Sequence, residues 1–283
     1  MSNELTGTEL AAITPEVWRG EILSARYSLA VGDQVCYTEF PEVKNKGDIV
    51  HLAVFPRLSV NAVGSGGTVT NQAVTLTDNS ITINNWMEAT VEVVDNAGFQ
   101  SMLGDSTVMA RKFAEQFAPR LVERQDNDIF ALYASLTGTQ QGDGTGEMGP
   151  ALIRMGMQAL DTARIPKAKR SLVLHPKSYW ELFGDQQFSL AHMTGLLRGV
   201  QVAGPDMLPT VYGIKYFESP EVNTTGGLRN LLIHKEAIAS VTQKNAKVVP
   251  LAKIQLSTRI TGHILYEPAV IRAEHGLQIF TAP

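Results

Sequence analysis

The sequence predicts an α+β fold, and three observations carry this prediction. Apolar and polar residues alternate with period two over much of 49–94, as in half-buried strands. Apolar residues recur every three or four positions over 105–136, as in a long amphipathic helix. Short helical and strand-like stretches then alternate up to residue 241. With 283 residues, 44% of them hydrophobic, the chain can bury a sizeable core.

The first expected element is an amphipathic helix that begins at Thr14-Pro15-Glu16. A threonine N-cap, a proline at the first helical position and an acid near the positive end of the helix dipole all favour a helix start. The apolar residues at helical spacing are Val17, Trp18, Ile22, Leu23 and Leu29. This helix packs either on its own domain or on a neighbouring subunit, and the sequence leaves both readings open.

A long β hairpin is expected next. Ile49 to Phe55 predicts its first strand, and the tract from Asn61 to Gly67 predicts an irregular tip because its residues tolerate positive φ. Beyond the tip, an alternating apolar pattern broken at Asp78-Asn79 comprises Val74, Leu76, Ile81, Ile83, Met87, Ala89, Val91 and Val93. Because a two-stranded ribbon is marginally stable in water, we expect a partner chain to cover its apolar face.

The helix expected from Asp105 to Leu136 would be about 45 to 50 Å long, with a kink or break between Gln116 and Pro119. A loop is expected over residues 137–146. Pro150 then favours the start of a second helix, which ends before Ile165-Pro166.

A compact α/β unit is expected to follow. Its elements are a strand at Ser171–Leu174, a helix from Pro176 to Phe183, a strand at Tyr212–Phe217 and a buried strand at Leu231–Ile233. The glycine-rich stretch between Phe183 and Tyr212 predicts irregular chain.

The last part of the chain predicts strands again. Ile254, Leu256 and Ile260 alternate with polar residues, a pattern typical of a sheet with one covered face. Pro268 is expected to interrupt this pattern before a final strand from Ala269 to Ala273.

Composition argues against several functions. The net charge of −4, and the excess of acids up to Lys44, disfavour direct binding to nucleic acid. One short basic cluster is interpreted as a solvated turn: Arg164, Lys167, Lys169 and Arg170. The single cysteine, Cys36, excludes an internal disulfide and fits a reducing cytoplasm. No run of about 20 apolar residues predicts a membrane span, and the polar start does not resemble a secretory signal.

Candidate reactive residues do not form a recognisable site. The histidines lack short ligand spacing, so no metal site is predicted: His51, His175, His192, His234, His263 and His275. His175 and Ser178 lie close in sequence, but no Gly-x-Ser-x-Gly elbow is present, and a histidine at a helix start is typically a surface or capping residue.

The remaining candidates also favour structural roles. Asp143 has too few oxygen-bearing neighbours for an EF-hand, and the glycine tracts lack the features of a phosphate loop. Trp18, Trp86 and Trp180 are expected to be separate packing anchors. No catalytic, cofactor-binding or metal-binding residue and no cofactor is therefore predicted.

The order of these elements resembles the major capsid protein family of tailed phages, the Hong Kong 97 type. The stretches that carry the resemblance are Lys46-Gly47-Asp48-Ile49-Val50, Gly142-Asp143-Gly144-Thr145-Gly146, Ile165-Pro166 with Arg170 to Pro176, Tyr179-Trp180-Glu181-Leu182, Tyr212-Gly213-Ile214-Lys215 and Leu231 to Ala237. Each motif is weak by itself, whereas their order and spacing span nearly the whole chain.

The resemblance implies a division into four parts. These are an N-terminal arm (1–43), an extended hairpin called the E-loop (44–94), a peripheral domain with a long spine helix (95–150 and 242–283) and an axial domain (151–241). It also implies self-assembly into the pentamers and hexamers of an icosahedral head that encloses double-stranded DNA. It implies no sequence-specific binding of that DNA, no membrane contact and no enzymatic activity. The implied location is the virion, with assembly in the host cytoplasm.

Two departures from the family pattern refine these expectations. No lysine occurs between Lys46 and Lys112, so a covalent cross-link through an E-loop lysine is not expected. Only about 40 residues precede the hairpin, which favours a separate scaffolding protein, or none, over a fused scaffold. The other implied partners are a portal and a decoration protein.

Three other functions are kept open at this point. An encapsulin-like nanocompartment has the same fold and would enclose an enzyme cargo instead of DNA. A soluble hydrolase or transferase would use the His175/Ser178 region, and a tail or baseplate protein would form rings or tubes instead of closed shells.

Overall fold

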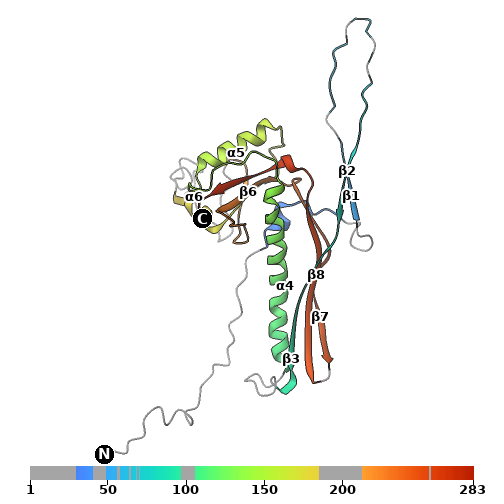
Figure 1. Cartoon of the computed structure of the whole chain (residues 1–283), viewed down its shortest axis with the longest axis vertical. Helices are drawn as coiled ribbons and strands as arrows, with labels where there is room; N and C mark the ends of the chain where they lie inside the picture. Colours follow the sequence, from blue (N-terminus) through green and yellow to red (C-terminus); the bar gives the residue numbers. More distant parts are fainter. Residues whose placement is uncertain are drawn as a thin grey trace, which may run out of the picture.

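The computed structural model describes residues 30–40, 49–55, 58–63, 65–67, 69, 71–96, 106–184, 212–254 and 256–283. Within these residues the chain forms a long helix against a three-stranded sheet, a smaller mixed unit at one end of that helix, and a projecting hairpin (Figure 1). The helix expected from Thr14 and nearly all of the irregular chain expected between Phe183 and Tyr212 lie outside the described residues.

The long sheet has the strand order β3-β8-β7, and both pairings are antiparallel. Its strands are β3 (Asn85–Val94), β7 (Ile238–Ile254) and β8 (Ser257–Val270). The alternation expected for Met87 to Val93 is confirmed, because these odd-numbered residues lie on the covered face of β3. The β7–β8 register shifts at three places, and such bulges increase local twist.

The spine helix α4 (Ser106–Ala131) lies along this sheet and continues into the short helix η2 (Leu132–Ser135) (Figure 1). Phe117 packs with Val93 and Ile260, and one turn later Leu121 packs with neighbouring residues of β8. The long helix is thus confirmed. Of the kink or break expected between Gln116 and Pro119, the break is wrong, since α4 is continuous through Pro119. Packing of Phe117 and Leu121 on either side of Pro119 stabilises the helix where one backbone hydrogen bond is missing.

The smaller unit contains a four-stranded sheet with the order β5-β4-β6-β9. Its strands are β4 (Arg170–Leu174), β5 (Lys215–Glu218), β6 (Leu228–His234) and β9 (Gly276–Thr281), of which only β4 and β5 pair in parallel. Two helices belong to this unit, α5 (Pro150–Thr162) and α6 (Pro176–Gly184), and both were expected from their prolines. The core of the unit joins Ile153 of α5 to Leu172, Leu232 and Leu277 of the sheet.

The strand pattern near the C-terminal end of the sequence differs from the expected one. The alternation of Ile254, Leu256 and Ile260 spans a turn between β7 and β8, and Leu256 is exposed there. Pro268 lies inside β8, opposite Ser240 of β7. It is tolerated because β3 pairs with β8 only as far as Tyr266, so that one side of β8 is an edge at Pro268. The last strand is β9, not Ala269–Ala273.

The projecting hairpin is shorter than expected. Its strands β1 (Ile49–Val54) and β2 (Thr77–Thr82) pair antiparallel, whereas β3 leaves the hairpin and pairs with β8. Asp78 and Asn79 do not break the strand, because each has a partner: Asp78 accepts a bond from His51 Nδ1 at 2.7 Å, and Asn79 donates to the Ile271 carbonyl at 2.9 Å. An alternating pattern indicates which face is covered but not which strand lies beside it.

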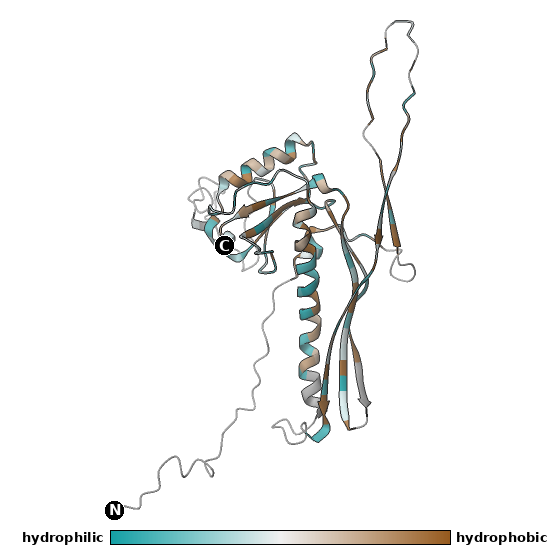
Figure 2. Ribbon diagram, viewed as in Figure 1, coloured by the Kyte–Doolittle hydropathy of each residue, from teal (hydrophilic) through white to brown (hydrophobic). Residues whose placement is uncertain are grey.

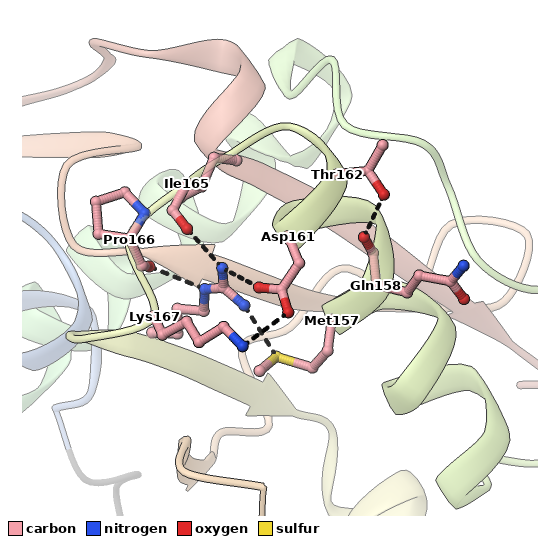
Figure 3. A network of polar contacts seen from close by, with 8 residues as sticks. Met157, Gln158, Asp161, Thr162, Ile165, Pro166 and Lys167 are labelled. Atoms are coloured by element: carbon pink, nitrogen blue, oxygen red, sulfur yellow. Dashed lines mark hydrogen bonds and ion pairs between the residues drawn. The ribbon is translucent and has the colours of Figure 1, made fainter.

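The basic cluster is not a solvated turn throughout. Arg170 is buried, and its guanidinium donates to Asp161 Oδ1 at 2.7 Å and to the carbonyls of Ile165 and Pro166 at 2.7 and 2.9 Å. Figure 3 shows Asp161, Ile165 and Pro166 converging on this point, with exposed Lys167 pairing with the same carboxylate at 3.2 Å. A buried arginine is tolerated because its donors meet a charged partner and two carbonyls.

Candidate assembly interface

The base of the hairpin is held by its own chain. Ile81 and Ile83 are buried together with Ala239 and Val241 of β7. Val50 and Leu52 of β1 are partly buried and pack against the same cluster. The hairpin therefore leaves the body of the molecule in a fixed place, because burial of these apolar side chains stabilises its attachment.

Beyond the base lies the distal ribbon, defined as residues 55–76, which extends away from the rest of the described chain (Figure 1). Its described residues form no β ladder. The Ser59 amide donates to Gln72 Oε1 at 3.0 Å, and Gln72 Nε2 donates back to the Ser59 carbonyl, so one side chain links the two sides of the ribbon. A turn at Ser65-Gly66 includes Gly66 at a φ of 81°, which glycine adopts without strain.

The distal ribbon exposes many apolar side chains. Those exposed to solvent are Phe55, Leu58, Val60, Val63, Val69, Val74 and Leu76. Val60 is 97% exposed and Phe55 is 74% exposed, and Figure 2 shows hydrophobic stretches along both sides of the ribbon. Of residues 55–76, only Arg57 is charged. An exposed, apolar and almost uncharged segment of this kind marks an interaction surface.

Two tryptophans add to the exposed apolar surface. Trp86, at the start of β3, is 67% exposed, with Lys244 Nζ 6.0 Å from its ring centroid. Trp180 on α6 is 66% exposed and has an edge contact with Tyr179, with the ring centroids 5.8 Å apart. The two side chains belong to different elements, as expected for separate anchors, but both are largely exposed in the single chain; Trp18 lies outside the described residues.

The structure separates the roles of His175 and Ser178. Ser178 is buried, and its hydroxyl accepts a hydrogen bond from Asn230 Nδ2 at 3.1 Å and bonds to Thr281 Oγ1 at 3.2 Å. His175 Nδ1 accepts a hydrogen bond from the Lys177 amide at 3.3 Å in the first turn of α6, and burial lowers its pKa. These contacts describe a structural polar cluster and a helix cap, so a hydrolase that uses the pair has no support.

Other candidate residues also have structural contacts. Asp143 Oδ1 accepts bonds from the Thr145 amide at 3.0 Å and the Thr145 hydroxyl at 2.7 Å, which lowers the pKa of Asp143 and closes a turn. Cys36 is buried as a free thiol, and burial raises its pKa. Among the helices in the described part of the chain, none is both long and apolar enough to span a bilayer.

One group of side chains was not anticipated from the sequence. His234, Glu236 and His275 lie together, although about 40 residues separate the first two from the third. The sequence showed only that histidines are present. His234 and His275 come together because the β6–β7 and β8–β9 connections lie side by side in the fold.

Comparisons with known proteins identify the fold. No family model matches the sequence, and no curated protein matches it. Among solved structures, the chain is similar to one from Mycobacterium phage Che8, at 19% identity and a TM-score of 0.75, over 94% of this chain and 96% of that one.

Two further structures give the same result. The capsid structure of the cyanophage P-SCSP1u matches at 17% identity and a TM-score of 0.73, over 98% of this chain and 95% of that one. The mature capsid of bacteriophage PhiM1 matches at 11% identity and a TM-score of 0.69, over 95% and 92%. The chain therefore shares its fold with these phage structures, and this is the Hong Kong 97-type fold expected from the sequence.

Proposed function

We propose that this chain is the major capsid protein of a tailed double-stranded DNA phage and that its copies assemble into an icosahedral shell of pentamers and hexamers. The observation that carries this proposal is the distal ribbon, which projects from a chain of Hong Kong 97-type fold with its apolar side chains uncovered. A second copy is the occupant that suits this ribbon, because a shell supplies every copy with identical neighbours.

Assembly of this kind needs no reactive group. Burial of a valine, leucine or phenylalanine side chain contributes about 1.5 to 3 kcal/mol, and several such side chains of the ribbon are largely exposed. Each contact in the shell is modest, whereas many contacts made by the same copy reinforce one another. The anchored base, with Ile81 and Ile83 buried, would transmit the position of the ribbon to the body of the subunit.

The parts of the chain would divide the work of assembly. Residues 1–43 would contact a neighbouring copy as an arm, and the hairpin part of 44–94 would lie across another. Residues 95–150 and 242–283 would form the rigid peripheral domain, to which β3 also contributes. Residues 151–241 would meet their copies around the five-fold and six-fold axes.

The other proposed partners follow from the same role. A separate scaffolding protein, a portal and a decoration protein would act with the shell, which would assemble in the host cytoplasm and become part of the virion. The enclosed DNA would contact the shell without sequence-specific binding, as a net charge of −4 favours.

Deletion of residues 64–71 from the hairpin tip tests the proposal. We expect the variant to fold, because the deleted residues lie beyond the anchored base, and to form no particles in negative-stain electron microscopy. A folded variant that still forms closed shells would show that the ribbon does not hold the copies together.

A point variant gives a sharper comparison at the same place. Val60→Asp removes an exposed apolar side chain and adds a charge, whereas Asn61→Asp adds the same charge at the adjacent exposed position without removing an apolar group. We expect Val60→Asp to raise the protein concentration needed for assembly by about tenfold, the effect of roughly 1.4 kcal/mol, and Asn61→Asp to change it much less. Equal effects of the two variants would assign the defect to charge alone.

A further inference from the structure

Three side chains with metal-binding groups meet where two chain connections run side by side. His234 ends β6, Glu236 lies in the turn between β6 and β7, and His275 ends the short helix η3 (Ala273–His275) between β8 and β9. One possible ligand atom from each residue lies within 4.8 Å of those of the other two. The rings of His234 and His275 meet edge to face, with their centroids 5.5 Å apart.

The cluster contains a polar atom without a partner. His275 is only 7% exposed, and its Nδ1 is the one buried side-chain nitrogen or oxygen without a hydrogen bond in the part of the chain that the structure describes. Leaving such an atom unsatisfied destabilises the folded chain. A ligand that binds an imidazole nitrogen would remove this destabilisation, and the neighbouring imidazole and carboxylate are groups that bind the same kind of ligand.

We propose that His234, Glu236 and His275 form a binding site for a divalent transition metal ion, with zinc as the ion that fits best. Two imidazoles and one carboxylate are a common zinc ligand set, with water or another group in the fourth position. Ligand atoms of a tetrahedral zinc ion lie about 3.3 Å apart, given bonds of about 2.0 Å. Because the three ligand atoms already lie within 4.8 Å of one another, binding requires only a small approach of the side chains.

The present contacts of the cluster are compatible with this movement. The His234 ring donates a hydrogen bond to the Ala168 carbonyl, and its Nδ1 accepts a long one from the Glu236 amide at 3.2 Å, which an ion bound to Nδ1 would replace. A backbone carbonyl bonded to one ring nitrogen is the usual way in which proteins orient a metal-binding histidine through the other. Glu236 is half exposed and only loosely paired with Arg272, at 3.9 Å, so little energy holds its carboxylate away from an ion.

The charges around the cluster are balanced. The positive charge of Arg170 lies close enough to act on the His234 ring, but Asp161, 2.7 Å from the Arg170 guanidinium, compensates this charge. On the other side of the His275 ring, Glu274 lies 4.0 Å from Nε2, where its carboxylate would offset positive charge without being a ligand. Together with Glu236, these acids would offset the positive charge that a bound ion and Arg272 bring.

Metal binding here would fix the junction between the two sheets. The β6–β7 turn and the η3 connection both lead from one sheet to the other, since β6 and β9 belong to the four-stranded sheet and β7 and β8 to the long sheet. An ion bound to both connections would hold the two sheets at one angle. This inference concerns the single chain and does not depend on the proposed assembly.

Zinc titration of the chelator-treated protein tests the proposal. We expect one zinc ion per chain by isothermal titration calorimetry, and a rise in melting temperature with zinc concentration because the ion binds the folded chain. When cobalt is added in place of zinc, we expect visible absorption bands of the kind that cobalt gives in a low-symmetry site with nitrogen ligands. Less than one ion per chain, or no cobalt spectrum, would overturn the site.

Two variants assign the ligands. Glu236→Gln changes an exposed side chain, so the protein should fold, and we expect its zinc affinity to fall by at least about tenfold. His263→Ala on β8 is the matched control, since it removes a histidine outside the cluster and should leave zinc affinity unchanged. His275→Ala should abolish binding where it folds. Equal zinc affinity in Glu236→Gln and His263→Ala would refute the assignment of Glu236 and with it the proposed site.

Discussion

Asp126 of the spine helix shows how a single residue joins distant parts of the chain. Its carboxylate accepts hydrogen bonds from the amides of Val31, at 2.7 Å, and Gly32, at 3.0 Å. These amides lie at the start of α2 (Gly32–Val35), a helical turn that packs against α4. Burial, together with the nearby acids Asp33 and Glu221, raises the pKa of Asp126 to about 6, although the two amides lower it.

This raised pKa predicts a pH dependence of stability. A carboxyl group with a higher pKa in the folded chain than in the unfolded chain favours folding in its protonated form. The contribution is fully present below the unfolded value of about 3.9 and is lost as the pH rises through about 6. Asp126→Asn does not ionise at this position, so we expect this loss to be absent from the variant. The free energy of unfolding of the variant relative to the original protein should therefore increase by up to about 3 kcal/mol from pH 4 to pH 7.

Urea unfolding of both proteins across that pH range measures the difference. Other acids have lowered pKa values, among them Asp143 and Asp161, and they change stability in the opposite direction. Because they are present in both proteins, they cancel in the comparison. The same pH dependence in both proteins would mean that Asp126 does not ionise as described.

Single residues were the least predictable part of the molecule. Arg170 belonged to a run of basic residues that suggested solvent exposure, and its burial is explained by Asp161 together with two backbone carbonyls that the fold places around it. His234 and His275 meet through tertiary structure, so their sequence spacing carried no signal. In contrast, His175 was expected to be a surface or capping residue from its place before Pro176, and it does accept a bond in the first turn of α6.

At the scale of elements, local sequence patterns predicted whether a segment is a helix or a strand better than they predicted which strands pair. The long helix and the helices begun by Pro150 and Pro176 were predicted because their signals lie within a few residues. The assignment of β3 to the hairpin was wrong because both possible partner strands satisfy the same alternation. The turn between β7 and β8 was missed because the apolar alternation continues across it.

The contact between α4 and β8 gives a prediction at this scale. A Cβ atom at Gly262 would lie 2.9 Å from the Cβ of Phe117, so Gly262→Ala requires the helix to move away from the sheet. We expect the free energy of unfolding to fall by about 1 to 3 kcal/mol, as measured by urea denaturation.

Gly146→Ala is the control for this substitution, because a Cβ there meets no atom within 4 Å. We expect its free energy of unfolding to stay within about 0.5 kcal/mol of the original. If Gly262→Ala proved as stable as the control, the helix would not press on the sheet at this point.

At the scale of the whole molecule, the order of elements was more informative than any motif. The Hong Kong 97-type fold was expected from the sequence because the resemblance rested on order and spacing, which survive when identity to similar structures is below 20%. The extent of the exposed ribbon needed the structure, since Ile81 and Leu76 look alike in sequence while only Ile81 is buried.

The small charge of the distal ribbon predicts how assembly responds to salt. With only Arg57 charged in residues 55–76 and a net charge of −4 on the chain, the ribbon contact should not depend on ion pairs. We expect the yield of particles, measured by light scattering, to hold or rise when sodium chloride increases from about 0.05 M to about 0.5 M, because salt screens repulsion between copies. Dissolution of particles over this range would indicate that ionic contacts dominate.

The position of β9 has a consequence for synthesis of the chain. Leu277 and Ile279 share a core with Ile153, and β9 completes the edge of the sheet beside β6. On the ribosome, this core stays open until residue 281 has been made and has left the exit tunnel. Contacts between such distant residues also form slowly. A half-made chain can thus display its ribbon but not a finished body, so partially synthesised copies would be unfit to join a growing shell.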